Sequence, residues 1–325
     1  MGKIPIMVLS GFLGSGKTTL LKRVIRKAEE DGLKISVLMN EIGQTDTDGR
    51  MLTEEADLPV EKLLDGCMCC NKKSEVSGAV LKLAETQPDL IVVELTGVAD
   101  PEEVADALSE PILLDKVYLQ RIVSVLDGEN LLDYSSIFTA EREIVRTIRK
   151  QMTYADTLIV NKEDQVTPEN REKISRLIAK ENPEAPVTFT SYCNVDLSQT
   201  VFGGSGRDRK VNAAEPHDSH DHKARVTTVK LNFPGPVKNK RAVEKFIKSL
   251  RPRLVRAKGY VPVKKEDRLF LMQHVMKKTY WERAEEPGES YLILIGVHLD
   301  EEEVKKVWEN VKPESPHNAG ERRQI

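Results

Sequence analysis

The sequence predicts an α/β protein, with a doubly wound parallel sheet in a first domain and a second, smaller α+β domain after it. Two observations lead to this prediction. Up to about residue 200, short unbroken apolar runs alternate with helical patterns, as in parallel strands that are covered on both faces. After residue 225, alternating and amphipathic segments follow one another. The strands expected in the first domain are residues 4–9, 35–39, 90–93, 122–126, 157–160 and 187–189.

Helical patterns fill the spaces between these runs. Residues 18–30 follow a glycine-rich segment, residues 74–86 carry apolar side chains at helical spacing, and residues 169–180 follow Thr167 and Pro168 in cap and first-turn positions. In such a doubly wound domain, ligands bind at the carboxyl ends of the strands. We therefore expect the functional residues at that edge of the sheet.

The domain boundaries follow from changes in composition. Residues 1–200 form the predicted first domain, and residues 201–225 read as a flexible linker that begins with a glycine-rich run. Residues 226–312 contain the second domain, with strands expected at 227–233 and 291–295 and helices at 241–250 and 301–311. Residues 313–325 hold two prolines without periodicity and are predicted to be a disordered tail.

Composition narrows the class of protein. The 325 residues are 39% apolar and 31% charged, with no apolar run near the roughly 18 residues that cross a bilayer. The chain enters its first strand without a secretory signal, so we expect a cytoplasmic protein with no membrane partner. The formal net charge of -3, with both signs interspersed, provides no basic surface for nucleic acid. Small molecules and proteins remain as partners.

A glycine-rich motif, GFLGSGKT, occupies residues 11–18 directly after the first expected strand. This pattern is a P-loop, in which glycines let backbone amides turn toward phosphates, Lys17 reaches the β- and γ-phosphates, and Thr18 can ligate Mg²⁺. The fold predicted is therefore that of a P-loop NTPase, with Lys17 exposed at the strand's end. The predicted phosphate-binding residues are Gly11, Gly14, Ser15, Gly16, Lys17, Thr18 and Thr19.

A second motif, Asn161-Lys162-Glu163-Asp164, ends the expected strand at residues 157–160. The Asp164 carboxylate can accept hydrogen bonds from both N1–H and the exocyclic amine of guanine, a pair of donors that adenine does not present together. Because each motif follows a strand, both belong at one edge of the sheet. The sequence thus predicts a GTP site in which Asn161, Lys162 and Asp164 contact the nucleotide.

Three of the four cysteines, Cys67, Cys69 and Cys70, fall within four positions. Thiolates are soft ligands for Zn²⁺, Co²⁺ or Cu⁺, and three protein ligands leave a position open for capture and release. Adjacent Cys69 and Cys70 do not readily face one ion, so two of the three thiols could bind. Buried apolar cysteines and a redox pair are the alternatives, although a thioredoxin-like spacer is missing. Cys193 is expected in the core or in a loop.

Taken in order, these motifs resemble the CobW family of GTP-dependent metallochaperones. The resemblance rests on the P-loop, the thiol triplet, the Asn-Lys-x-Asp motif, and the segments at residues 40–43, 94–97 and 99–101. Residues 254–260 and 292–296 look like the C-terminal domain of that family. The resemblance implies a slow GTPase that holds Zn²⁺ or Co²⁺ at the thiols and passes it to a client metalloprotein.

By family position, Glu41 is a candidate metal ligand beside the thiols, and Asp48 a candidate for orienting Mg²⁺ or its water. Glu94 takes the place of the acid that accompanies Mg²⁺ in P-loop enzymes, with Gly97 near the γ-phosphate. The loop at residues 40–49 could be ordered by γ-phosphate and Mg²⁺ in the manner of a GTPase switch. Glu41 could equally be a solvated loop acid, and Asp48 a turn former.

The sequence leaves several alternative roles and functions open. His217, His220 and His222 could collect metal or belong to an inert linker, and Glu110 stands where some relatives carry a histidine that can contact metal. A nucleotide-independent zinc buffer is one alternative function. A nickel-insertion GTPase is another, although no Cys-Pro-type metal motif is found. A P-loop kinase is a third, against which Asp164 and the thiols both count.

Overall fold

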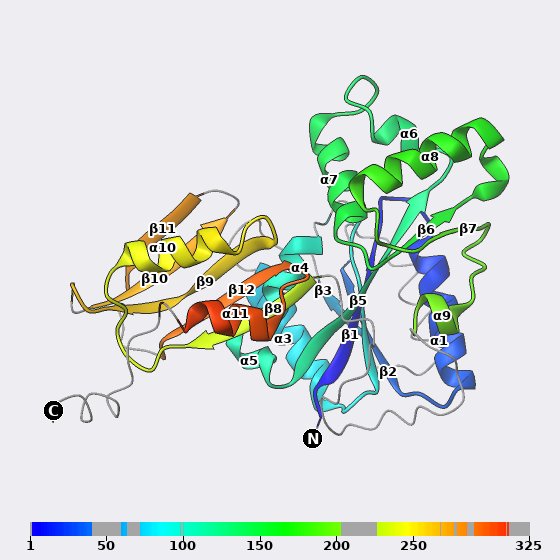
Figure 1. Cartoon of the computed structure of the whole chain (residues 1–325). Coiled ribbons are helices and arrows are strands. Elements are labelled where there is room, and N and C mark those ends of the chain that lie inside the picture. Colours follow the sequence, from blue (N-terminus) through cyan, green and yellow to red (C-terminus); the bar gives the residue numbers. More distant parts are fainter. Residues whose placement is uncertain are drawn as a thin grey trace, which may run out of the picture. The chain divides into compact units, whose positions relative to one another are not determined.

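The computed structural model describes residues 2–40, 60–63, 72–97, 99, 101–202, 226–266, 268–275, 278–284, 289–309 and 311. The chain divides into two compact units, Met1–Arg225 and Val226–Ile325 (Figure 1). Several residues singled out in the sequence lie outside the described ranges. They are Glu41, Asp48, Cys67, Cys69, Cys70, His217, His220 and His222, together with most of the expected linker and all of the expected tail.

The first unit is built on a parallel sheet of seven strands, in the order β3-β2-β4-β1-β5-β6-β7. Chain order reverses on either side of β1, which is the switch point where ligands of doubly wound sheets bind. The predicted fold class is thereby confirmed, and only β3, which contains two charged residues, had not been predicted. The strands are β1 (Ile4–Ser10), β2 (Ile35–Asn40), β3 (Val60–Leu63), β4 (Leu90–Glu94), β5 (Val117–Asp127), β6 (Thr157–Asn161) and β7 (Val187–Phe189).

Helices cover both faces of this sheet. The three helices predicted from the sequence correspond to α1, α3 and α8, and Thr167 caps α8 by accepting a hydrogen bond from the Asn170 amide. The intervening α4 to α7 had not been predicted. The helices of this unit are α1 (Lys17–Glu30), α3 (Lys72–Glu85), α4 (Pro101–Leu108), α5 (Pro111–Leu114), α6 (Leu131–Tyr134), α7 (Arg142–Thr153), the 3₁₀ turn η1 (Glu163–Gln165), α8 (Pro168–Glu181) and α9 (Leu197–Thr200).

Two apolar clusters lie on opposite faces of the sheet, as the alternation along β6 shows. Ile159 joins the cluster formed with α1, whereas Leu158 and Val160 join the one formed with α6, α7 and α8. Val201 is buried in the first cluster and Phe202 packs against it, so the packing of this unit continues past residue 200. Both faces are covered, which explains the unbroken apolar runs of the strands.

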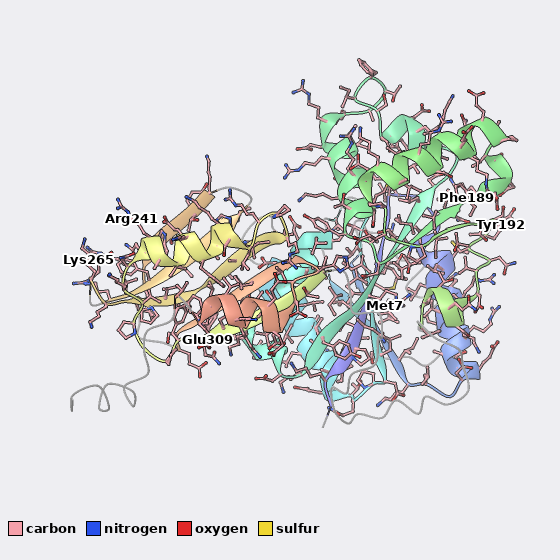
Figure 2. All side chains as sticks on the ribbon, viewed as in Figure 1. Met7, Phe189, Tyr192, Arg241, Lys265 and Glu309 are labelled. Carbon is pink, nitrogen blue, oxygen red and sulfur yellow. The ribbon has the colours of Figure 1, made fainter. Side chains whose placement is uncertain are left out.

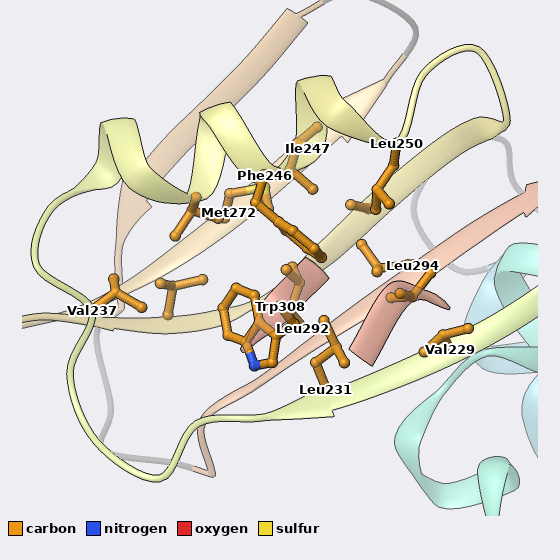
Figure 3. Packing of buried hydrophobic residues seen from close by; sticks show 14 of the residues in the cluster. Val229, Leu231, Val237, Phe246, Ile247, Leu250, Met272, Leu292, Leu294 and Trp308 are labelled. Carbon is orange, nitrogen blue, oxygen red and sulfur yellow. The ribbon is translucent and has the colours of Figure 1, made fainter. Parts of the chain in front are cut away.

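The second unit is an antiparallel sheet, ordered β11-β10-β9-β12-β8, with its core between the sheet and two helices. Trp308 packs against Phe246 and Phe233 at 4.9 and 5.1 Å between ring centroids. Figure 3 shows Trp308, Phe246 and Leu292 in this cluster. This confirms the expected α+β architecture, although β9, β10 and β11 had not been predicted. The elements are β8 (Val226–Asn232), α10 (Lys240–Ser249), β9 (Leu254–Val263), β10 (Arg268–Val275), β11 (Lys278–Arg283), β12 (Tyr291–Val297) and α11 (Glu301–Trp308).

Candidate functional site

The glycine-rich loop between β1 and α1 has the backbone that phosphate binding needs. Gly11, Gly14 and Gly16 have φ values of 140°, 71° and 111°, a region that glycine adopts without steric cost. A Cβ on Gly11 would lie 2.1 Å from the Val125 carbonyl oxygen, whereas Gly14 faces open space. Gly16 caps α1 without a side-chain hydrogen bond. Gly16 therefore leaves the first amides of α1 without a side-chain cap, and an anion-binding helix end needs such uncapped amides.

Lys17 is folded back onto this loop rather than exposed, so the expectation of an exposed lysine is wrong. Its Nζ donates to the carbonyl oxygens of Gly11 and Phe12 at 2.9 and 3.3 Å, and the side chain is buried. Burial lowers the pKa of Lys17, and the negative charge of Glu94 opposes that shift. The loop carbonyls take the place of water around the ammonium. Phosphate oxygens would in turn replace the carbonyls when a nucleotide binds.

Thr18, in the first turn of α1, meets Glu94 at the carboxyl end of β4. Thr18 Oγ1 donates to Glu94 Oε1 at 2.9 Å, and Glu94 is a buried acid at the end of β4. A hydroxyl and a carboxylate are hard oxygen ligands of the kind that Mg²⁺ takes beside nucleotide phosphates. The donor set therefore fits Mg²⁺, which would there neutralise charge on the phosphates.

Gly97 packs directly against the phosphate loop. A Cβ at this position would lie 2.4 Å from the Leu13 backbone nitrogen, so the close approach requires glycine. The Gly97 carbonyl accepts a hydrogen bond from Gln151 Nε2 of α7 at 3.1 Å, in a buried position. Gln151 had not been predicted as a site residue. Its only sequence signal is a polar side chain on the apolar face of an amphipathic helix.

Asp164 lies in the turn after β6 as an exposed carboxylate held by neighbouring side chains. Ser191 Oγ donates to Asp164 Oδ1 at 2.6 Å, and Gln165 Nε2 donates to Oδ2 at 2.7 Å. These hydrogen bonds lower the pKa of Asp164, and the bond from Ser191 contributes most to the shift. The group is therefore kept ionised and oriented, as a carboxylate that accepts from guanine must be.

Asn161 connects three loops by its side chain. Nδ2 donates to the Ser15 carbonyl oxygen at 2.9 Å, and Oδ1 accepts from the Cys193 amide at the same distance. Cys193 in turn directs its thiol at the Gly16 carbonyl oxygen, 3.4 Å away. Both polar atoms of Asn161 thus bond to protein, and its side chain holds the phosphate loop to the loop that follows β7.

Lys162 adopts a left-handed conformation with φ of 61° and forms an ion pair with Asp127 at the end of β5. Its Nζ lies 2.8 Å from Asp127 Oδ2 and 3.6 Å from Glu129 Oε2. The hydrogen bond to Asp127 is the main reason that the pKa of Lys162 is raised. With its head group held there, the aliphatic stem of Lys162 is available to line the flat face of a base.

The loop that follows β7 completes this part of the site and had not been predicted. Tyr192 and Cys193 have φ values of 55° and 52°, two consecutive non-glycine residues in the left-handed region. Figure 2 shows Tyr192 just beyond Phe189, the last residue of β7. Cys193 is both in a loop and in the core, and burial raises the pKa of its thiol to about 11. In the sequence, this loop is indicated by the polar residues that follow the strand expected at residues 187–189.

Within the described ranges, no group of three or more His, Cys, Asp or Glu side chains is placed to hold a metal ion. The predicted ligands Glu41, Cys67, Cys69 and Cys70 lie outside those ranges. Glu110 is the extended residue that precedes Pro111 at the start of α5. As for membranes, none of the helices described combines the length and apolar composition that crossing a bilayer requires.

A glycine-rich phosphate loop, an oxygen pair fit for Mg²⁺ and an oriented carboxylate in the Asn-Lys-x-Asp motif, all at one edge of a parallel sheet, are typical of a P-loop nucleotide-binding protein. The comparison with protein families agrees. The CobW/HypB/UreG nucleotide-binding domain matches residues 5–189, and the cobalamin synthesis protein cobW C-terminal domain matches residues 226–312. The chain belongs to the CobW family, as its resemblance indicated.

Three relatives illustrate the similarity. The zinc chaperone YjiA of Escherichia coli is 28% identical over 330 residues, covering 96% of this chain and 100% of that protein. The zinc chaperone CobW of Pseudomonas aeruginosa is 27% identical, covering 93% of this chain and 89% of its own length. The zinc-regulated GTPase metalloprotein activator 1 of Schizosaccharomyces pombe is 34% identical over 59% of this chain and 47% of that protein. Among solved structures, Zn(II)-bound YjiA GTPase from E. coli is 24% identical, with a TM-score of 0.47. The match covers 96% of this chain and 100% of that chain.

Proposed function

We propose that this chain is a GTPase metallochaperone that binds Zn²⁺ or Co²⁺ as cargo and delivers it to a client metalloprotein. The observation that carries the proposal is the hydrogen-bonded frame around Asn161, which joins the phosphate loop to the base-reading loops. The carboxylate of Asp164, held by Ser191, lies in the same frame and selects guanine. Relatives named as zinc chaperones support the nature of the cargo.

The proposed reaction is hydrolysis of GTP to GDP and phosphate. Lys17 and the first amides of α1 would bind the phosphates, while Thr18 and Glu94 would hold Mg²⁺. Asp164 would accept from the guanine N1–H and amine, beside the stem of Lys162. Slow intrinsic turnover is expected until cargo or client completes the site.

The sheet register supports a cargo site next to the proposed magnesium ligands. Glu94 is the register partner of Leu9 in β1 and of Met39 in β2, so the acid lies next to the end of β2. Asn40, the last residue of β2, pairs in register with Leu63, the last residue of β3. The ends of β2 and β3 therefore lie side by side; in the sequence Glu41 and Asp48 follow the first of these ends, and Cys67, Cys69 and Cys70 follow the second. We propose that these residues form one cargo site which the nucleotide state controls.

The test is a titration of Zn²⁺ and Co²⁺ into the wild type and a Cys67→Ser, Cys69→Ser, Cys70→Ser variant, each with GDP or a non-hydrolysable GTP analogue. Metal and GTP analogue should strengthen each other's binding by the same factor, about 5- to 150-fold, because linkage is reciprocal. Co²⁺ should show sulfur-to-metal charge transfer only in the wild type. Uptake should weaken as pH falls, because thiolates are the ligands.

A His217→Ser, His220→Ser, His222→Ser variant serves as the matched control. It should retain the tight site and the hydrolysis rate, because the proposed ligands are the thiols and Glu41. Equal metal affinity in both nucleotide states would reject the switch and favour a nucleotide-independent zinc buffer. Loss of tight binding in the histidine variant would instead move the cargo site to the linker.

A further inference from the structure

The loop between α6 and α7 displays two large apolar side chains to solvent. Ile137 is 63% exposed and Phe138 is 92% exposed. The loop is nevertheless closed by its own hydrogen bonds, since the amides of Thr139 and Ala140 both donate to the Ser136 carbonyl oxygen. Figure 1 shows this loop projecting from the ends of the two helices. A fixed backbone that presents Phe138 is preorganised for binding, because little further ordering is needed.

A basic stripe begins four residues further along, on α7. Arg142, Arg146, Arg149 and Lys150 contribute to the walls of a hollow of ≈ 410 Å³ along this helix. Arg149 lies 3.7 Å from Glu181. Arg142 and Arg146, in contrast, form no ion pair within the described part of the chain, and both are exposed. The stripe is positive although the whole chain carries a net charge of -3.

Both helices that flank this loop contact the nucleotide site. Tyr134, the last residue of α6, packs against Phe12 of the phosphate loop with ring centroids 4.9 Å apart. On α7, Gln151 donates to the carbonyl oxygen of Gly97, which itself lies against the phosphate loop. A shift of the phosphate loop would therefore be transmitted through both α6 and α7 to the loop that joins them.

We propose that Ile137, Phe138, Arg142 and Arg146 form a docking surface for an acidic segment of a protein that also carries an apolar side chain. The proposal rests on the metallochaperone function proposed above, because the client is the partner that must sense the nucleotide state. Carboxylates complement the two unpaired guanidinium groups, for which they are bidentate partners. Phe138 supplies the large apolar contact from which interface energy is mostly derived. A single-stranded nucleic acid would use the arginines and would stack a base on Phe138, but it would leave the aliphatic Ile137 without a partner.

The experiment measures fluorescence anisotropy of labelled short peptides with the full chain, loaded with GDP or the GTP analogue. The first probe alternates Glu with Leu and Phe, the second replaces Glu by Lys, and the third replaces Leu and Phe by Ser. A single-stranded RNA of equal charge is the fourth. The acidic apolar peptide should bind, and Phe138→Ser or the pair Arg142→Glu and Arg146→Glu should each weaken it about tenfold or more. Tyr280→Ser and Arg241→Glu, in the second unit, are the matched controls and should leave the affinity unchanged.

Failure of this proposal is separable from failure of the proposed function. The proposal is overturned if the acidic apolar peptide does not bind the wild type, binds all variants equally, or is outcompeted by RNA that needs the same arginines. Linkage between metal and GTP would survive each of those results. Peptide affinity should differ between the GDP and GTP-analogue states of the wild type, and Gln151→Leu should retain peptide binding but lose that difference. Dependence that persists unchanged in that variant would overturn the route through Gly97.

Discussion

Replacing Asn161 by alanine should destabilise the first unit, although the residue belongs to a motif that reads as nucleotide-binding. Its side chain makes two hydrogen bonds in a buried position, one to the Ser15 carbonyl oxygen and one from the Cys193 amide. Truncation to Ala removes both partners at once. Asn161 itself is only 5% exposed, so water does not reach these groups without a local opening.

The magnitude follows from the two groups that are left without a partner. A buried donor or acceptor that loses its hydrogen bond costs about 1–3 kcal/mol. For the Ser15 carbonyl and the Cys193 amide together, the free energy of unfolding should fall by about 2–5 kcal/mol when the two penalties are partly relieved by relaxation. Nucleotide affinity should fall as well, because the phosphate loop and the base-reading loops are no longer fixed to each other.

Urea unfolding followed by far-UV circular dichroism measures the first effect, and binding of a fluorescent GDP analogue measures the second. Asn194→Ala is the matched control, because Asn194 is an exposed asparagine of the same loop region whose Oδ1 accepts from Arg23. That control should cost less than about 1 kcal/mol. A stability loss for Asn161→Ala no larger than that of Asn194→Ala would refute the bridging role.

Four further predictions concern other residues of the first unit. Asp164→Asn should shift the nucleotide preference from GTP to xanthosine triphosphate. Ser191→Ala should raise the pKa of Asp164, so that on acidification guanine binding is lost at a higher pH than in the wild type. Nucleotide titrations across pH measure both effects. Lys17→Ala should weaken nucleotide binding about 100-fold or more. The Tm should stay nearly unchanged, because removing the buried charge also removes the cost of burying it. A large fall in Tm would count against this prediction. Cys193 should react slowly with thiol reagents at neutral pH, and its contribution to stability, present below its ordinary pKa of 9.0, should be lost as pH rises toward about 11. Rapid labelling of Cys193 in the folded protein, located by peptide mass spectrometry, would contradict its burial.

The sequence by itself determined the fold class and the family to which the chain belongs. Both GTP motifs are short and contiguous, and their chemistry depends on local backbone and on a few side chains, as at Gly11, Lys17 and Asp164. The unbroken apolar strands reveal a sheet covered on both faces, and this places the motifs at one edge. The helix at residues 142–153 had not been predicted, although Val145, Ile148 and Met152 mark its buried face at helical spacing.

Tertiary structure alone decided which residues hold the site together. Asn161 and Ser15 are 146 positions apart, and Ser191 reaches Asp164 only because β7 pairs with β6. The strand β3, with two charged residues among its four, is defined by its ladder with β2 rather than by an apolar pattern. A periodic pattern reports which face a residue occupies, whereas these contacts depend on distances between remote segments, and only packing sets those distances.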